Sequence, residues 1–262
     1  MKIYDIVILG AGASGLMCAS NLSKKKSVAI IDGNDRVAKK LKISGGGKCN
    51  ITNSSVSLNN FDGNQELLAG VLKRFSKDNL LQFLDRNRVA LELRKNRYYF
   101  CQNSSDDIID VLKRGVKHSE LFLNHTIIQV KKLHDNFEVK TNNGVFQAKN
   151  IVVATGGKSF KTLGASEIGL DIAKNFGIKV KEFSPALVGL TVQKEQFWMR
   201  KLSGLSCYVE IKVEDRIINE EMLFAHKGIS GPAILSASLY WQKGELSIDF
   251  LPNQKIIELV SS

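Results

Sequence analysis

The sequence of 262 residues lacks any apolar run long enough to cross a bilayer, because its longest runs, such as IVVAT at residues 151–155, have only the length of buried strands. The amino-terminal segment MKIYDIVILG is too short in its apolar part, and too soon interrupted by glycine, to be a secretory signal. We therefore expect a cytoplasmic protein with no membrane partner.

Cysteine is also scarce, since the sequence contains only Cys18, Cys49, Cys101 and Cys207, which lie far apart and form no CxxC pair. This spacing suggests neither a zinc site nor a dithiol motif, so we expect no bound metal. Reduced thiols in a reducing compartment fit the pattern best.

Acidic residues are outnumbered, because 26 Asp and Glu stand against 37 Lys and Arg, which gives a net charge of +11. We expect a solvated, lysine-rich surface, since most lysines are scattered and no recognisable nucleic-acid motif accompanies the short basic clusters. Attraction to a polyanion such as RNA is the alternative that this charge leaves open.

The amino-terminal region has the pattern of a β-α-β unit. A buried strand is predicted over residues 4–9, a helix over 14–26 and a second buried strand over 27–32. The following region mixes helical and strand patterns, with Ser76 as a predicted N-cap. It comprises helices at 65–75 and 78–87, a hairpin at 91–100, a helix beginning at 105–107, strands through 121–155 with an Asn-Gly hairpin, and a helix at 166–176.

After Pro185 the character of the sequence changes. Short strand-like runs predict a small β domain. A loop marked by Gly228, Gly231 and Pro232 is followed by a short helix within residues 233–239. The predicted strands are 187–192, 207–213, 216–223 and 244–250.

The first motif is the run Gly10-Ala11-Gly12-Ala13-Ser14-Gly15, a GxGxxG pattern between a predicted strand and a predicted helix. The glycines permit a tight turn, close approach of a pyrophosphate and packing of the helix on the strand. The phosphates would meet free N–H groups at the positive end of the helix. Asp32 ends the next strand and can accept hydrogen bonds from an adenosine ribose.

Two further glycine motifs follow predicted strands. The stretch ISGGGKCNITN, residues 43–53, offers close backbone approach to a flat or phosphorylated ligand at Gly45 to Gly47, with a positive charge at Lys48 and an amide at Asn50. A flexible surface loop is the alternative. The run Thr155-Gly156-Gly157 can bring backbone against a cofactor, although it also fits a plain strand-end turn.

His226 lies in the segment LFAHKGISGPAIL, residues 223–235, and is one of four histidines. An imidazole titrates near neutrality and can move protons, which makes His226 the one catalytic candidate. A surface or structural histidine is the competing interpretation. Ser230 has no acid–base partner nearby in the sequence, so we predict no nucleophilic serine.

These motifs, in this order, resemble one family. The strand-GAGASG start is similar to flavoproteins with a two-dinucleotide-binding-domain fold. ISGGGKCNITN is similar to the SGGGRCN(V/I/L)TN signature of the BaiN or aminoacetone-oxidase type (YhiN-type) family of FAD-dependent oxidoreductases. ATGGKS, SPALVGL and LFAHKGISGPAIL resemble later signatures of that family, and the resemblance spans essentially the whole chain.

The resemblance implies bound FAD and an α/β, Rossmann-like FAD-binding domain over residues 1–186, with a β-meander at about 121–155 and a β-rich inserted domain at 187–252. Asp32 would bind the adenosine ribose, although glutamate is commoner there in the family. The implied cofactor-binding residues are Gly10, Gly12, Ala13, Ser14, Gly15, Asp32, Gly33, Lys40, Ser44, Gly45, Gly46, Gly47, Lys48, Cys49, Asn50, Ile127, Thr155, Gly156 and Gly157.

The chain departs from the family in two places. Residues 160–169 are less glycine-rich than the family's STGDG-like stretch, which puts their contact with cofactor or substrate in doubt. Family members also continue well beyond the equivalent of residues 249–252, and we expect residues 253–262 to begin a carboxyl-terminal part that this shortened chain lacks.

The implied activity is flavin-mediated hydride or electron transfer on a small organic substrate. No second GxGxxG is present, so NAD(P)H would visit the flavin only transiently. Cys49 lacks a second cysteine a few residues on, which argues against a thiol–disulfide relay and favours a packing role. Two alternatives stay open, namely an RNA-binding or RNA-modifying flavoprotein and a non-catalytic remnant of the FAD domain.

Overall fold

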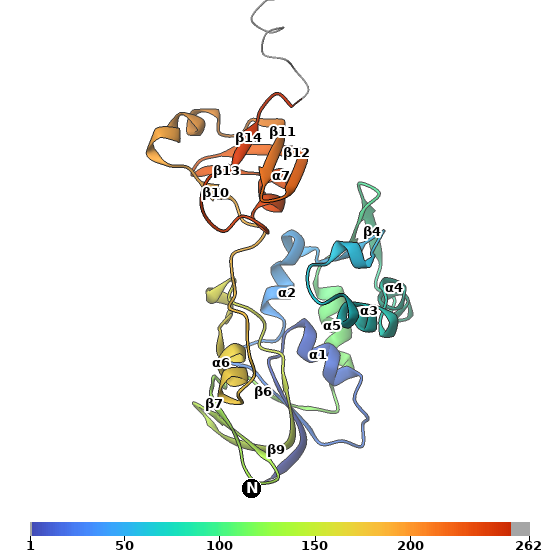
Figure 1. Ribbon diagram of the computed structural model, residues 1–262. Helices are drawn as coiled ribbons and strands as arrows, with labels where there is room; N and C mark the ends of the chain where they lie inside the picture. Colours follow the sequence, from blue (N-terminus) through green and yellow to red (C-terminus); the bar gives the residue numbers. More distant parts are fainter. Residues whose placement is uncertain (1, 253–262) are drawn as a thin grey trace, which may run out of the picture. The chain divides into compact units, whose positions relative to one another are not determined.

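The structure is a computed structural model that describes residues 2–252. The expectation for residues 253–262 therefore lies outside the described residues. The chain divides between Lys181 and Glu182 into two compact units (Figure 1). Each unit has a hydrophobic core of its own.

The first unit is built on a six-stranded sheet with the order β6-β2-β1-β9-β8-β7. Its first four strands in that order are parallel neighbours, whereas β9, β8 and β7 form an antiparallel meander. The strands are β1 (Ile3–Leu9), β2 (Val28–Ile31), β6 (Glu120–Phe122), β7 (Ile127–Lys132), β8 (Phe137–Thr141) and β9 (Gly144–Val153).

Both faces of this sheet are covered, which explains why β1 and β2 are continuous apolar runs. Ile8 and Ile30 point into a core formed with helices α1 (Ala13–Ser20) and α5 (Asp106–Gly115). Their neighbours Leu9 and Ile31 point into a second core, which the meander and helix α6 (Ile168–Asn175) complete.

A smaller sheet follows the glycine stretch of the sequence. It has the order β3-β5-β4, with β3 (Asn50–Asn53), β4 (Leu91–Arg94) and β5 (Tyr98–Cys101). Helices α3 (Gln65–Arg74) and α4 (Lys77–Arg86) lie between β3 and β4 in the chain, and Ser76 caps α4 as predicted, because its side chain accepts from the N–H of Asn79. The hairpin of β4 and β5 extends past α3 and α4 (Figure 1).

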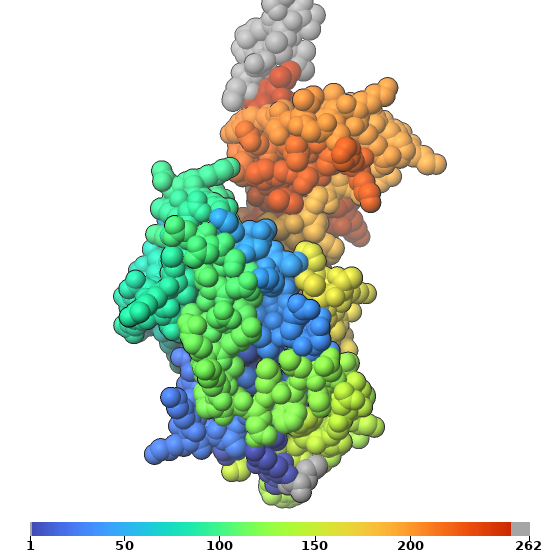
Figure 2. Space-filling model, turned by 180° about the vertical axis from the view of Figure 1, so that it is seen from behind, coloured from blue at the N-terminus to red at the C-terminus, as the bar shows by residue number. Residues whose placement is uncertain are grey.

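Short helical turns connect these elements. Helix α2 spans Lys39–Ile43 and contacts α5, and in Figure 2 the blue residues of this stretch lie against the green residues around α5. The one-turn helices are η1 (Ser44–Gly47), η2 (Leu58–Asn60) and η3 (Lys161–Leu163).

Helix α1 is shorter than the prediction of residues 14–26, because it ends at Ser20. Two polar side chains bond to a carbonyl of the last turn, since Ser20 Oγ and Asn21 Nδ2 each donate to the Met17 oxygen at 2.8 Å. Such local bonds favour a helix end over another turn of helix.

The second unit is an antiparallel sheet with the order β10-β13-β12-β11-β14, packed on helix α7 (Gly231–Ala237). A nine-residue helical turn, η4 (Lys194–Leu202), follows β10 and was not predicted. The strands are β10 (Leu190–Thr191), β11 (Ser206–Val213), β12 (Arg216–Ala225), β13 (Gly228–Ser230) and β14 (Ser247–Asp249).

The predicted loop at residues 228–232 is wrong, because the chain forms β13 there and then begins α7. Gly228 lets β10 approach, since a Cβ at this position would lie 2.1 Å from the Leu190 carbonyl oxygen. Pro232 sits in the first turn of α7, where a missing N–H costs no helical hydrogen bond.

Candidate functional site

A cavity of about 620 Å³ opens at the carboxyl ends of β1, β2 and β9, entirely within the first unit. The strand order reverses at β1, because the chain runs outward from β1 to β2 and β6 on one side and later adds β9 on the other, so this is the topological switch point at which open α/β sheets bind ligands. The cavity is lined by Gly10, Ala11, Gly12, Ala13, Ser14, Ile31, Asp32, Gly33, Asn34, Ala38, Lys39, Lys40, Leu41, Ser44, Thr126, Ile127, Val153, Ala154, Thr155, Gly156, Gly157, Leu163, Gly164, Ala165, Ser166 and Ile168.

The turn between β1 and α1 has the geometry of a phosphate-binding turn. Gly10 has a φ of 112°, and a Cβ there would lie 2.4 Å from the Ala154 carbonyl oxygen. Gly15 does not line the cavity; it packs α1 against the turn, because its Cβ would lie 1.9 Å from the Gly10 oxygen. Open space surrounds Gly12, where a ligand's phosphates can reach the start of α1.

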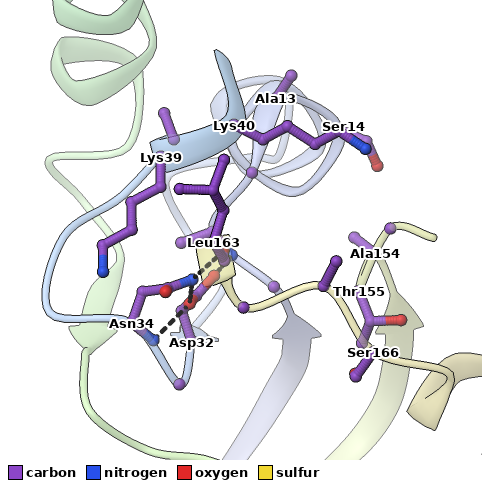
Figure 3. Close-up of a pocket in the computed structure, with 18 of the residues that line it drawn as sticks. Ala13, Ser14, Asp32, Asn34, Lys39, Lys40, Ala154, Thr155, Leu163 and Ser166 are labelled. Atoms are coloured by element: carbon purple, nitrogen blue, oxygen red, sulfur yellow. Dashed lines mark hydrogen bonds between the residues drawn. The ribbon is translucent and has the colours of Figure 1, made fainter. Parts of the chain in front are cut away.

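Asp32 holds the turn after β2 against the turn after β1. Its Oδ2 accepts from the N–H of Ala11 at 2.7 Å, and its Oδ1 accepts from the N–H and the Nδ2 of Asn34 at 2.8 and 2.9 Å (Figure 3). These three bonds use both lone pairs of Oδ1 and one of Oδ2, so Oδ2 can still accept from a ribose hydroxyl.

The second wall comes from β7 and from the segment after β9. Ile127 lines it, as do Thr155, Gly156 and Gly157. Gly33 lies against Thr126, whose Oγ1 would be 3.1 Å from a Cβ on the glycine.

Residues 160–169, whose contact with a cofactor the sequence left in doubt, line the cavity through several members, including Leu163 and Ser166. Asn34 connects this segment to Asp32, because its Nδ2 donates both to Asp32 Oδ1 at 2.9 Å and to the Leu163 oxygen at 3.2 Å. Sequence analysis did not select Asn34. Its position two residues after the strand-ending acid was the available signal.

Two lysines, Lys39 and Lys40, add positive charge to the lining of the cavity. Lys40 Nζ donates to Ser159 Oγ at 2.9 Å and lies 5.7 Å from the centre of the Phe160 ring. Lys39 forms an ion pair of 2.6 Å with Asp35. Both lysines line the cavity and can attract an anionic ligand.

The glycine stretch is divided by the structure. Ser44 lines the cavity, whereas Gly45, Gly46, Gly47, Lys48, Cys49 and Asn50 do not. The stretch is nevertheless anchored, because the buried Ser105 donates its N–H to the Gly47 oxygen and its Oγ to the Lys42 oxygen, both at 2.8 Å. Lys48 Nζ is held by the Gln102 oxygen at 3.0 Å.

Cys49 has a cysteine neighbour that its sequence surroundings do not show. Cys49 and Cys101 are both free, with exposed fractions of 2% and 0%, and they belong to one core cluster. Asn50, the residue after Cys49, lies opposite Phe100, the residue before Cys101, and the Cys101 N–H donates to the Lys48 oxygen at 2.8 Å. Burial raises the pKa of both thiols, that of Cys101 to about 11, so both stay protonated and poorly nucleophilic at neutral pH.

His226 lies in the second unit, in the exposed turn between β12 and β13. Its Nδ1 is 3.2 Å from Ser203 Oγ. Among the hydrogen bonds of the described residues, none joins His226 to a carboxylate that could orient a catalytic imidazole.

Residues 2–252 contain no cluster of three or more His, Cys, Asp or Glu side chains placed to hold a metal ion. Over the same residues, no helix combines the length and the apolar character needed to cross a membrane.

The sequence from residue 4 to residue 242 matches the family model described as "HI0933-like protein Rossmann domain". The chain belongs to this family. Its Rossmann-like α/β FAD-binding fold, predicted from the sequence, is thereby confirmed, and one solved structure with the same fold is the open conformation of a flavocytochrome c3 fumarate reductase. The two align with a TM-score of 0.52 at 16% identity, over 79% of this chain and 47% of the reductase.

Curated relatives extend beyond this chain. Proteins named ribosomal RNA dihydrouridine synthase are 33% identical in Haemophilus influenzae and 32% identical in Escherichia coli, over 97% of this chain and 66% and 65% of their own lengths. A 3-dehydro-bile acid delta(4,6)-reductase of Clostridium scindens is 26% identical over 95% of this chain and 65% of its own length. The chain thus spans about two thirds of the relatives that it matches.

Proposed function

We propose that the chain binds FAD in the cavity at the ends of β1, β2 and β9. The observation that carries this proposal is the joint geometry of the Gly10–Gly15 turn, the strand-ending Asp32 and the Thr155–Gly157 segment around one cavity. Its volume of about 620 Å³ lies within the range of small-molecule and cofactor sites. The open space at Gly12 would receive the pyrophosphate, and Asp32 the adenosine ribose.

We propose further that this chain belongs to a reductase that adds hydrogen across a carbon–carbon double bond. The proposed substrate is a uridine of ribosomal RNA. Conversion of uridine to dihydrouridine adds one hydride and one proton across the C5=C6 bond, so two electrons must be supplied. FAD, when bound and reduced, supplies that hydride, and NAD(P)H is the donor that we expect to reduce it. Two relatives named for this product, at 33% and 32% identity, support the proposal.

The second candidate substrate is a small organic molecule with an activated double bond. The relative named as a bile acid reductase, at 26% identity, favours this candidate. It corresponds to the BaiN-type resemblance of the glycine motif. The two candidate functions share the cofactor and the reduction of a double bond. They differ in whether the protein must bind an RNA or a small molecule.

The test begins with an FAD titration of the chain, followed by anaerobic reduction with NADH and NADPH. The reduced protein is then mixed with ribosomal RNA that lacks dihydrouridine, or with a 3-dehydro-delta(4,6) bile acid. We expect mass spectrometry to find two added hydrogen atoms on a uridine. Reduction of the bile acid but not of RNA would select the second candidate, and an unperturbed flavin spectrum would support the non-catalytic remnant.

A further inference from the structure

Positive charge is concentrated in the first unit. Residues 1–181 contain 29 Lys and Arg against 16 Asp and Glu, a net charge of +13, whereas residues 182–252 contain 7 against 9. Within the first unit, residues 86–97 contain five Arg and Lys against a single acid, Glu92. This basic stretch ends in the turn between β4 and β5.

One face of the sheet β3-β5-β4 carries aromatic rings beside an arginine. Glu92 and Arg94 on β4 lie opposite Phe100 and Tyr98 on β5, and Asn53 on β3 also lies opposite Tyr98. Residues directly opposite one another in an antiparallel pair share a face. We call these five residues the hairpin face.

The hairpin face points away from the core of the first unit. The alternate residues of the same two strands, Leu91 with Cys101, lie opposite one another and belong to the core cluster. Arg94 is held on the outer side by bonds from its Nε and Nη2 to Glu92 Oε2 at 3.1 and 3.0 Å, and its guanidinium lies 4.7 Å from the Phe100 ring centre. Rings and guanidinium therefore form a preorganised surface.

This face adjoins the glycine stretch and so the cavity. A Cβ on Gly45 would lie 2.8 Å from the edge of the Phe100 ring, which shows how closely the ring covers that backbone. Ser44, the preceding residue, lines the cavity. A ligand lying across Phe100 would thus lie beside Gly45, the residue next to Ser44 in the wall of the proposed cofactor site.

The turn at the end of the hairpin supplies cations that have no acidic partner. Lys95 and Arg97 are exposed, and neither forms an ion pair with another described residue. The Arg97 guanidinium lies 5.2 Å from the Tyr98 ring centre.

We propose that the hairpin face and its turn are the docking surface for single-stranded RNA. Bases stack on Tyr98 and on the Arg94–Phe100 pair, while Lys95 and Arg97 contact phosphates. Stacking on aromatic rings combined with phosphate contacts is the usual way in which proteins bind single-stranded nucleic acid. The inference rests on the proposed function, because it names the surface that brings an RNA uridine beside the cavity.

The first test measures the affinity of the chain for a fluorescein-labelled, uridine-containing single-stranded RNA by anisotropy over a series of salt concentrations. Lys95→Glu/Arg97→Glu is compared with Lys24→Glu/Lys25→Glu, which makes the same charge change in the exposed turn between α1 and β2. We expect the hairpin variant to bind about tenfold more weakly at about 50 mM salt, and its salt slope to fall by about 1.4 for two lost phosphate contacts. The control should stay within about twofold of the wild type.

The second test separates stacking from charge. Tyr98→Leu keeps apolar bulk in β5 but removes the ring, whereas Tyr98→Phe keeps the ring. We expect Tyr98→Leu to weaken RNA binding roughly fivefold or more and Tyr98→Phe to restore it, since stacking on an aromatic ring is a substantial part of single-strand affinity. Binding of inorganic polyphosphate, which has no bases, should not distinguish these two variants.

The outcomes separate this inference from the proposed function. Equal losses in the hairpin and control charge variants, or no RNA binding by the wild-type chain, would overturn the docking surface. Formation of dihydrouridine by a hairpin variant at the wild-type rate under subsaturating RNA would overturn it as well, while leaving the proposed function intact. FAD titration and thermal unfolding of each variant confirm that the cavity and the fold are retained.

Discussion

The Asp32 carboxylate and the Ala11 amide join the carboxyl ends of two adjacent strands, with Oδ2 2.7 Å from the nitrogen. Besides its proposed contact with a ribose, Asp32 thus fixes the turn on which we propose that a pyrophosphate lies. The other oxygen, Oδ1, orders the turn after β2 through Asn34. One side chain therefore sets the relative positions of two parts of the cavity.

Replacement of Asp32 by alanine should weaken both FAD binding and the fold. The change leaves the N–H groups of Ala11 and Asn34 without this acceptor, and each unsatisfied group costs about 1–3 kcal/mol if it stays buried. Flavin fluorescence titration and urea unfolding provide the two measurements. Asp110→Asn on the exposed side of α5 is the control, and an equal effect there would show that Asp32 has no special position.

Gly15 and Gly70 provide a matched pair of glycines within helices. A Cβ on Gly15 would collide with the Gly10 carbonyl oxygen at 1.9 Å, whereas nothing lies within 4 Å of a Cβ on Gly70. Gly70→Ala should raise the free energy of unfolding by about 0.5–1 kcal/mol, because alanine is the better helix former. Gly15→Ala should lower the free energy of unfolding and also abolish FAD binding. Denaturant unfolding with and without FAD measures both effects. A Gly15→Ala variant more stable than the wild type would refute the packing role.

The Cys101 thiol should make stability fall at alkaline pH. Burial, with the neighbouring Cys49 adding to it, raises the pKa of Cys101 from its ordinary value of 9.0 to about 11. Below pH 9 the thiol is protonated in both states; between pH 9 and 11 only the unfolded state releases the proton, so rising pH favours unfolding.

Urea midpoints for the wild type and Cys101→Ala, measured from pH 8 to 11, test this effect. The wild type should lose stability more steeply, because the variant has no thiol to ionise at this position. The same burial predicts that iodoacetamide modifies neither Cys49 nor Cys101 in the folded protein at pH 7.5. Parallel pH profiles would contradict the prediction.

Ser105 should be a stability determinant of the glycine stretch. Its Oγ is buried and donates to the Lys42 carbonyl oxygen at 2.8 Å. Ser105→Ala removes the donor and should cost about 1–2 kcal/mol. Hydrogen exchange should then accelerate at Cys49, whose N–H bonds to Ser44, because the stretch loses an anchor.

Ser104→Ala, one residue away, removes a half-buried hydroxyl whose hydrogen bonds stay within its own turn, at Asp106. It should leave exchange at Cys49 unchanged. Equal acceleration in the two variants would assign the effect to the helix start of α5 rather than to the anchor.

The sequence by itself determined the β-α-β unit, the glycine turn at residues 10–15 and the strand-ending acid. These features are local, because strand burial, glycine spacing and the residue after a strand are all written within about 30 residues. The N-cap of α4 at Ser76 and the hairpin at residues 91–100 are local in the same sense, and both are present.

Only the tertiary structure decided which glycines meet the cavity and which residues become neighbours across the chain. The stretch after Ser44 turns away from the cavity and packs under Phe100, and Cys49, just before β3, joins Cys101 of β5 in one core cluster. Likewise, Asn34 meets Leu163 only because β2 and the segment after β9 end at the same edge of the sheet. Strand order and pairing create these contacts, and neither follows from the spacing of residues within one segment.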